Sequence, residues 1–143
     1  MDSKSVLISI HPEYVAKILE REKCVEFRRI WASKEINEMV IYATAPVSRI
    51  VAIARVTNVV FASPNYIWKK YKDQGPGITR LKLMKYFYGK SKCVAIELSG
   101  IEEFVNRPQL KFIFGAQSRP PQSFQYIDKV TLKKLKRYKR VSR

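Results

Sequence analysis

Hydrophobic positions in the first half of the chain change between strand spacing and helix spacing. Residues 6–10 (VLISI) form a short apolar run, which predicts a strand that ends at His11-Pro12. Apolar residues then recur at helical spacing from Tyr14 to Leu19, which predicts a helix over residues 12–21 with proline in its first turn. Residues 39–44 and 49–61 predict two more strands, and the second is apolar enough to be buried on both faces.

The second half of the chain has helix-start signals between further strand patterns. Ser63, Thr79 and Asp128 each precede a helical pattern and are typical N-cap residues. Strands are expected over residues 93–98 and 124–127, with a further strand or arm near 104–114 and a frayed end past Arg137. About six strands and three or four short helices in mixed order favour an α+β fold with a curled, barrel-like sheet.

One strand pattern carries charge on one side only. In residues 23–29 (KCVEFRR), Val25 and Phe27 fall on one face, while Glu26 and Arg28 fall on the other. With Lys23 they form a charged trio attached to an apolar strand face. Such a trio is either an ion-pair network that satisfies itself or a ligand site, and the sequence alone leaves both open.

The net charge favours an anionic partner. The chain has 143 residues, 28 Lys and Arg against 12 Asp and Glu, and a formal charge of +16. Residues 129–143 hold eight of the basic residues and no acid, so +8 remains for residues 1–128. We therefore expect one folded domain over 1–128 and a basic helix or tail over 129–143. A positive field of this size attracts polyanions, of which nucleic acid is the most common.

Several classes of protein are disfavoured by the composition. No apolar run approaches the roughly 20 residues of a membrane span, and no secretory signal is seen, so a cytoplasmic protein without a membrane partner is expected. Cys24 and Cys93 stand apart without a C-x-x-C spacing, and His11 is the single histidine. We therefore expect no metal site and no cofactor. His11 itself is expected to serve at the helix entry.

Five separated segments together resemble an ASCH domain, which belongs to the PUA-like β-barrel superfamily. They are LISIHPEY (7–14), EKCVEFR (22–28), IYATAP (41–46), YFYGK (86–90) and PPQSF (120–124). The family signature resembles G-x-K-x-x-E-x-R: Lys23, Glu26 and Arg28 match it, while Arg21 stands at the glycine position. The resemblance covers roughly residues 5–128.

The resemblance implies a small β-barrel with a cleft walled by helices and bearing the signature charges. Such domains are expected to bind RNA, and some resemble enzymes that hydrolyse acylated cytidine or cleave RNA. The members that resemble amidohydrolases look to use three residues for catalysis: a lysine, a threonine at the position that corresponds to Glu26, and a glutamate on a later strand. Lys23 is retained and Glu97 is a candidate for the later carboxylate, but the threonine hydroxyl that would attack an acyl carbon is absent.

The leading hypothesis is a module that binds RNA, or DNA, without catalysis. A nucleotide or exposed base would occupy the cleft, and Trp31 or Trp68 would stack on a base, since aromatic residues among basic ones suit this role. The candidate binding residues are Lys23, Glu26, Arg28, Arg29, Arg55, Trp68, Lys133, Lys134, Lys136 and Arg137. The alternative is an RNA or nucleoside hydrolase that uses Lys23 with Glu26 or Glu97. A third reading is an adaptor that docks an acidic protein, of unknown identity.

Overall fold

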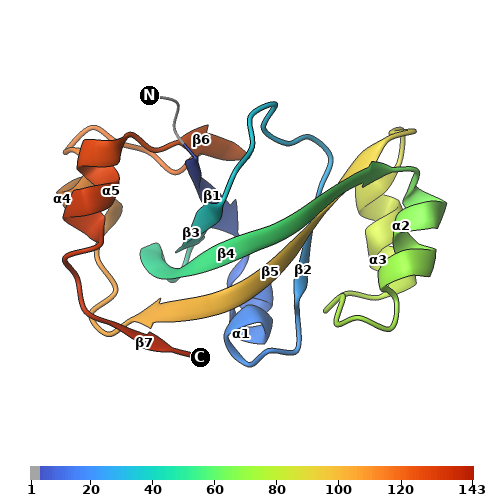
Figure 1. The fold of residues 1–143 in the computed structure, drawn as a ribbon, viewed down its shortest axis with the longest axis horizontal. Helices are drawn as coiled ribbons and strands as arrows, with labels where there is room; N and C mark the ends of the chain where they lie inside the picture. Colours follow the sequence, from blue (N-terminus) through green and yellow to red (C-terminus); the bar gives the residue numbers. More distant parts are fainter. Residues whose placement is uncertain (1–3) are drawn as a thin grey trace.

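A computed structural model describes residues 4–143, which form one mixed β-sheet flanked by short helices (Figure 1). The elements in chain order are β1 (Ser5–Ile10), α1 (Pro12–Leu19), β2 (Val25–Arg28), β3 (Glu38–Ala43), β4 (Arg49–Ala62), α2 (Pro64–Tyr71), α3 (Arg80–Phe87), β5 (Cys93–Phe104), α4 (Leu110–Phe114), β6 (Phe124–Tyr126), α5 (Lys129–Leu135) and β7 (Arg140–Ser142). The strand order is β2-β5-β4-β3-β1-β6, and β7 pairs with β5. The expected α+β fold with a curled sheet is confirmed.

Four of the helices cover the sheet in two separate places, and α1 packs on the inside of the curl. In Figure 1, α4 and α5 lie at one end of the molecule, and α2 and α3 lie at the other. The first pair packs with the outer face of β1, β3 and β4 around Leu7, Val40 and Ile50, while the second pair packs on Phe27 and Ala95. A third cluster fills the inside of the curl. This division explains the pattern of β4, which is buried on both faces only over its first half.

The helix starts follow the predicted caps. The side-chain oxygens of Ser63, Thr79 and Asp128 accept hydrogen bonds from the backbone N–H groups of Tyr66, Lys82 and Thr131. Each bond satisfies one of the donors that a helix leaves unpaired at its first turn. The Thr79 cap fixes where α3 begins, and α3 forms one side of the site described below.

Two expectations about the second half of the chain are wrong. The segment near residues 104–114 is no single strand or arm: β5 runs on to Phe104, Pro108 follows, and Leu110 and Ile113 then bury one side of the helix α4. The end past Arg137 is not frayed. Residues Arg140–Ser142 form β7, where Arg140 pairs with Glu102 at 3.1 Å and Arg143 pairs with Glu103 at 3.2 Å.

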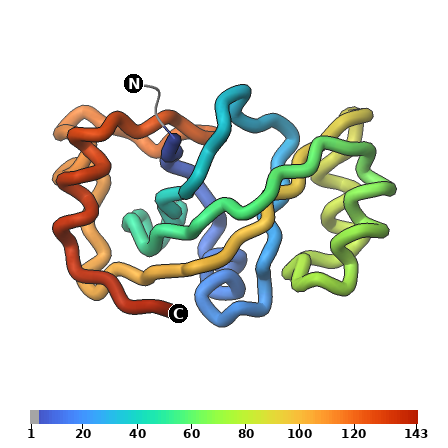
Figure 2. The backbone as a smooth tube through the Cα atoms, in the orientation of Figure 1, coloured from blue at the N-terminus to red at the C-terminus, as the bar shows by residue number. Residues whose placement is uncertain are grey.

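The backbone trace shows how distant segments meet at the sheet (Figure 2). β1 lies between β3, with which it is parallel, and the late strand β6. The loop over residues 29–37 connects β2 to β3, which occupy separate parts of the sheet. Within residues 4–143, no helix has both the length and the apolar character needed to cross a bilayer.

Candidate functional site

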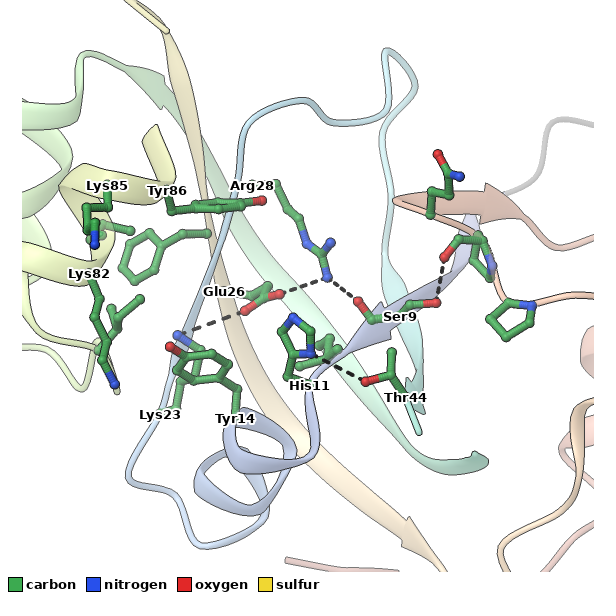
Figure 3. Close-up of a pocket in the computed structure, with 17 residues that line it drawn as sticks. Ser9, His11, Tyr14, Lys23, Glu26, Arg28, Thr44, Lys82, Lys85 and Tyr86 are labelled. Atoms are coloured by element: carbon green, nitrogen blue, oxygen red, sulfur yellow. Dashed lines mark hydrogen bonds and ion pairs between the residues drawn. The ribbon is translucent and has the colours of Figure 1, made fainter. Parts of the chain in front are cut away.

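A cavity of about 680 Å³ opens beside β2, and the predicted trio lines it (Figure 3). Its walls are formed by β1, α1, β2, the end of β3, α3 with the loop that precedes it, and the loop before β6. The lining residues are Ser9, Ile10, His11, Tyr14, Lys23, Glu26, Phe27, Arg28, Thr44, Ile78, Lys82, Leu83, Lys85, Tyr86, Pro120, Pro121 and Gln122. We call this cavity the cleft. Its volume is in the range of pockets that hold small ligands.

The alternation predicted for β2 places the trio in the cleft. Val25 and Phe27 are buried under α2 and α3, while Glu26 and Arg28 point to the other face. Glu26 lies between the two cations: its Oε2 is 2.9 Å from Arg28 Nη2, and its Oε1 is 3.9 Å from Lys23 Nζ. The trio is therefore both an ion-pair network and the wall of an open cavity, so the two alternatives left by the sequence do not exclude each other.

Lys23 is held by the loop between α2 and α3. Its Nζ donates to the carbonyl of Pro76 at 2.7 Å and lies 4.8 Å from the centre of the Phe27 ring. Gly77 has φ +65°, and a Cβ there would stand 2.6 Å from Lys23 Cβ, so the close approach requires glycine. With only 3% of Lys23 exposed, burial lowers the pKa of its ammonium, an effect that Glu26 opposes and that Lys17 and Arg28 reinforce.

Arg28 connects the trio to the end of β1. Its Nη2 donates to the Ser9 carbonyl at 2.7 Å in addition to its ion pair with Glu26. Its Nε is buried and has no hydrogen-bond partner in the described part of the chain. A buried N–H without a partner costs about 1–3 kcal/mol, so the network is retained at some cost to stability.

Two tyrosines and the histidine complete the polar lining. Burial raises the pKa of both Tyr14 and Tyr86, so each remains a neutral hydroxyl with a flat ring at the cleft (Figure 3). His11 is the N-cap residue of α1, in agreement with its expected helix-entry position, and its Nδ1 lies 3.5 Å from Thr44 Oγ1. The position of His11 also places it on the cleft wall.

The charge of the cleft lining is positive. Lys23, Arg28, Lys82 and Lys85 carry four positive charges and Glu26 one negative charge, which leaves +3 with His11 neutral. Lys82 and Lys85 are exposed on α3, one turn apart, so they face the solvent side of the site. The cleft thus combines apolar and aromatic walls with a net positive charge.

Seven of the ten predicted binding residues lie outside the cleft lining, and three of these, Arg29, Arg55 and Trp68, lie on or next to the sheet and on α2. Arg29 donates to the carbonyls of Tyr86 and Tyr88 at 2.8 and 2.7 Å, which ties the end of α3 to β2. Arg55 is exposed on β4 beside Gly100 and does not line the cleft. Trp68 packs against the cluster under α2 and α3.

Glu97, the candidate later carboxylate, has hydrogen-bond partners outside the cleft. Its Oε2 accepts from the Tyr71 hydroxyl at 2.6 Å and from Asn58 Nδ2 at 3.1 Å, rather than from Arg55 or Lys23. Together with burial, the bond to Glu97 raises the pKa of Tyr71. Glu97 shares the face of Val25, its partner in the register, and so lies across the sheet from the trio.

The basic residues of the C-terminal segment lie apart from the cleft. Lys133, Lys134 and Arg137 are exposed on or just after α5, whereas Lys136 forms an ion pair with Glu38 at 2.9 Å. None of these four lines the cleft. In Figure 1, α5 lies at the opposite end of the molecule from α3.

Several lining residues went unnoticed in the sequence. They are Ser9, Tyr14, Thr44 and Gln122, which come from three separate segments that only the sheet topology brings together. A usable signal existed for all four of them, because they stand in the segments 7–14, 41–46 and 120–124 that carry the family resemblance. Within residues 4–143, no group of three or more His, Cys, Asp or Glu side chains could hold a metal ion.

Comparisons with known proteins agree with this architecture. Residues 3–116 match the family described as "Domain of unknown function (DUF365)". An "ASCH domain-containing ribonuclease" of Zymomonas mobilis is 31% identical over 137 residues, which cover 94% of this chain and 91% of that protein. The chain belongs to the ASCH and DUF365 families. The resemblance inferred from the five segments is thereby confirmed.

Solved structures extend the agreement to the fold. The crystal structure of an ASCH protein from Zymomonas mobilis superposes with a TM-score of 0.86 at 28% identity, covering 99% of this chain and 98% of that one. The N-terminal domain of McrB from Staphylothermus marinus matches with a TM-score of 0.59 at 13% identity over 93% of each chain. The second likeness shows a shared fold alone.

Proposed function

We propose that this ASCH domain binds single-stranded RNA and holds one nucleotide in the cleft. The observation that carries the proposal is the buried Lys23–Glu26–Arg28 network in the wall of an open cavity whose lining has a net charge of +3. Burying three charges is costly, and the chain retains them where a ligand can reach them. A positive lining favours an anionic ligand, and the relative named as a ribonuclease supports RNA among such ligands.

The two kinds of wall suit the two parts of a nucleotide. The rings of Tyr14 and Tyr86 and the partly exposed side chain of Ile78 can contact a base. Lys82 and Lys85 would meet its phosphate from the edge of α3. Arg28 connects the ion-pair network to this site, because it pairs with Glu26 and its side chain lines the cleft.

Residues outside the cleft would add phosphate contacts along the strand. The exposed Lys133, Lys134 and Arg137 of the C-terminal segment are available for this role, whereas Lys136 would have to leave Glu38. Phosphate contacts raise affinity without reading sequence. Arg29, Arg55 and Trp68 are not part of the proposed nucleotide site, since none of them lines the cleft.

The test uses two double variants with the same loss of charge. Lys82→Ala/Lys85→Ala removes two exposed lysines three residues apart at the cleft, and Lys69→Ala/Lys72→Ala removes two exposed lysines with the same spacing from α2 and its end. We expect the first variant to lose about tenfold or more in affinity for a single-stranded RNA and the second to lose little. Equal losses would mean that overall charge, rather than the cleft, binds the RNA. An identical DNA strand measures the preference for RNA.

A second candidate function is RNA cleavage, because the relative from Zymomonas mobilis is named a ribonuclease. In transesterification the RNA 2′-oxygen bonds to phosphorus, the bond to the 5′-oxygen breaks, and one proton leaves the 2′-hydroxyl while another reaches the 5′-oxygen. The lowered pKa of Lys23 makes its amine easier to deprotonate, and Arg28 would stabilise the charge on phosphorus. Glu97 has no place in this scheme because it lies across the sheet.

Cleavage is tested on the same protein. Purified wild type and Lys23→Met are incubated with labelled RNA, in magnesium and in a chelator, and products are separated on a gel. A 2′,3′-cyclic phosphate product that Lys23→Met fails to form would establish this second function. Intact RNA after prolonged incubation with a protein that binds it would leave the binding function alone.

A further inference from the structure

A second cavity lies on the same face of the sheet as the trio. In the β2-β5-β4 register, Arg28 pairs with Val94, which pairs with Phe61. Directly paired residues point to the same face, so Phe61 shares the face of Arg28. The two residues are separated by two interstrand spacings, or about 10 Å. The cleft and this second cavity are therefore neighbours along one surface.

The second cavity differs from the cleft in charge. It has a volume of about 480 Å³ and is lined by the loop from Trp31 to Asn37 together with residues of β4 between Val56 and Phe61. Among its lining residues only Lys34 and Glu35 carry charge, and the two cancel. The cleft, in contrast, has a net charge of +3. A neutral lining suits an uncharged aromatic group better than a phosphate.

Two aromatic side chains form its walls. Phe61 is 50% exposed on β4. Trp31 packs against Phe124 with ring centres 5.3 Å apart, and Phe124 in turn meets Tyr126 edge-on at 5.8 Å. This row of rings supports the indole from one side. A supported tryptophan beside an exposed phenylalanine is a platform on which a nucleobase stacks.

The β4 wall of this cavity is shaped by a β-bulge. The register shifts between Val56 and Asn58, so that Thr57 is the extra residue. Thr57 Oγ1 donates to the backbone carbonyl of Glu97 at 3.2 Å, and Asn58 Nδ2 donates to the Glu97 carboxylate at 3.1 Å. Bulges occur where a strand must redirect its side chains next to a site. Glu97 thus supports the second cavity, not the cleft.

We infer that this second cavity binds a base of the same single-stranded RNA whose nucleotide occupies the cleft. The inference rests on the proposed function. Arg28 and Trp31 are three residues apart in the chain, so their Cα atoms lie within about 11 Å. A short single strand covers this distance. The charged cleft holds the backbone together with one nucleotide, and the neutral cavity takes a neighbouring base between Trp31 and Phe61.

The experiment compares two phenylalanines of similar exposure. Phe61→Ser removes the platform at 50% exposure, and Phe112→Ser changes a phenylalanine that is 56% exposed on α4, outside both cavities. Binding of an RNA octanucleotide is titrated with each variant. We expect Phe61→Ser to lose about tenfold in affinity, as for removal of one stacked ring, and Phe112→Ser to bind like wild type. An octanucleotide with one abasic site, moved along its length, should show two sensitive positions in wild type and one in Phe61→Ser.

Fluorescence provides a direct signal from the platform. Trp31 and Trp68 are the two tryptophans of the chain, so Trp68→Phe leaves Trp31 as the reporter. Its emission should change when the octanucleotide binds. If wild type binds the RNA while Phe61→Ser binds equally well and Trp31 emission stays constant, the second site is wrong and the proposed function stands. If wild type does not bind the RNA at physiological salt, both are wrong.

Discussion

The cleft and the C-terminal segment are both rich in positive charge, yet they hold it in opposite ways. In the cleft, Lys23 and Arg28 are almost fully buried, and backbone carbonyls and Glu26 fix their positions. On α5, Lys133 and Lys134 are exposed on a helix surface. Both regions raise the potential around the molecule, but the cleft fixes its charges by buried contacts, whereas the charges of Lys133 and Lys134 lie at the helix surface.

This difference separates selectivity from attraction. Fixed and partly desolvated groups discriminate between ligands, because a wrong ligand leaves them unpaired. Exposed lysines attract a charged ligand through water before contact is made, and salt screens this attraction. We therefore expect the cleft to decide which nucleotide is held and α5 to influence how fast and how tightly any polyanion is attracted.

Arg28→Ala should be the most damaging single change. It leaves Glu26 buried with Lys23 Nζ at 3.9 Å as its remaining cation and removes the bond to the Ser9 carbonyl. Breaking a buried ion pair in this way costs about 3–5 kcal/mol of unfolding free energy. Urea unfolding measures it. Arg137→Ala, at an exposed position after α5, should change stability by less than about 0.5 kcal/mol. Similar losses of stability in both variants would contradict the difference between the cleft and the C-terminal segment.

Gly77→Ala tests the loop that holds Lys23. The new Cβ would stand 2.6 Å from Lys23 Cβ on a backbone with φ +65°, so strain and overlap together should cost about 2–4 kcal/mol. Gly89→Ala is the matched control: its φ is +84°, but nothing lies within 4 Å of the added Cβ. It should cost only the backbone strain, about 1–2 kcal/mol. Thermal unfolding compares the two, and an equal effect would mean that Lys23 is not clamped.

The stability of the fold should rise with pH because of Lys23. Burial lowers the pKa of this ammonium below 10.5, so between the lowered pKa and 10.5 the folded state binds fewer protons than the unfolded state. Stability then increases with pH, by at most about 1.4 kcal/mol per pH unit. Lys23→Met lacks this contribution. Urea unfolding of both proteins from neutral pH to pH near 10 should show that the free energy of unfolding of wild type increases relative to that of the variant. Parallel curves would contradict a buried Lys23.

The smallest effects are expected on α5. Lys133→Ala/Lys134→Ala should lower the slope of log affinity against log salt by about 0.7 for each phosphate that the variant no longer neutralises. The decrease should be the same for RNA of any sequence. Lys69→Ala/Lys70→Ala, two adjacent exposed lysines on α2, is the control with the same charge change. A sequence-dependent decrease in the α5 variant would give this segment a share in selectivity.

Local patterns predicted the elements of this fold well. The caps at Ser63, Thr79 and Asp128 form as expected, because a cap depends on residues within one turn. The alternation in β2 placed Glu26 and Arg28 on the correct face for the same reason. β7 was missed because a three-residue strand carries almost no pattern of its own. Its place depends on pairing with Glu102–Phe104 and on two ion pairs.

The site was predictable only as far as one segment extends. Lys23, Glu26 and Arg28 lie within six residues, and their spacing could be read directly. Arg55 and Glu97 were assigned to the site by residue type alone. The register of the sheet determines which face each side chain occupies, and Glu97 pairs with Val25 and so faces away from the trio. Tyr14, Thr44 and Gln122 join the cleft through a sheet in which β1 lies between β3 and β6. No local pattern encodes that order.

The pairing of β1 with β6 also has a consequence for synthesis of the protein. Val6–Ile8 acquire their antiparallel neighbour only when residues 124–126 are available, and that neighbour is in place just before the chain continues into α5. Contacts of such sequence separation form slowly, because a long loop must close first. On the ribosome, an early strand would therefore wait with one edge unprotected until most of the polypeptide has emerged.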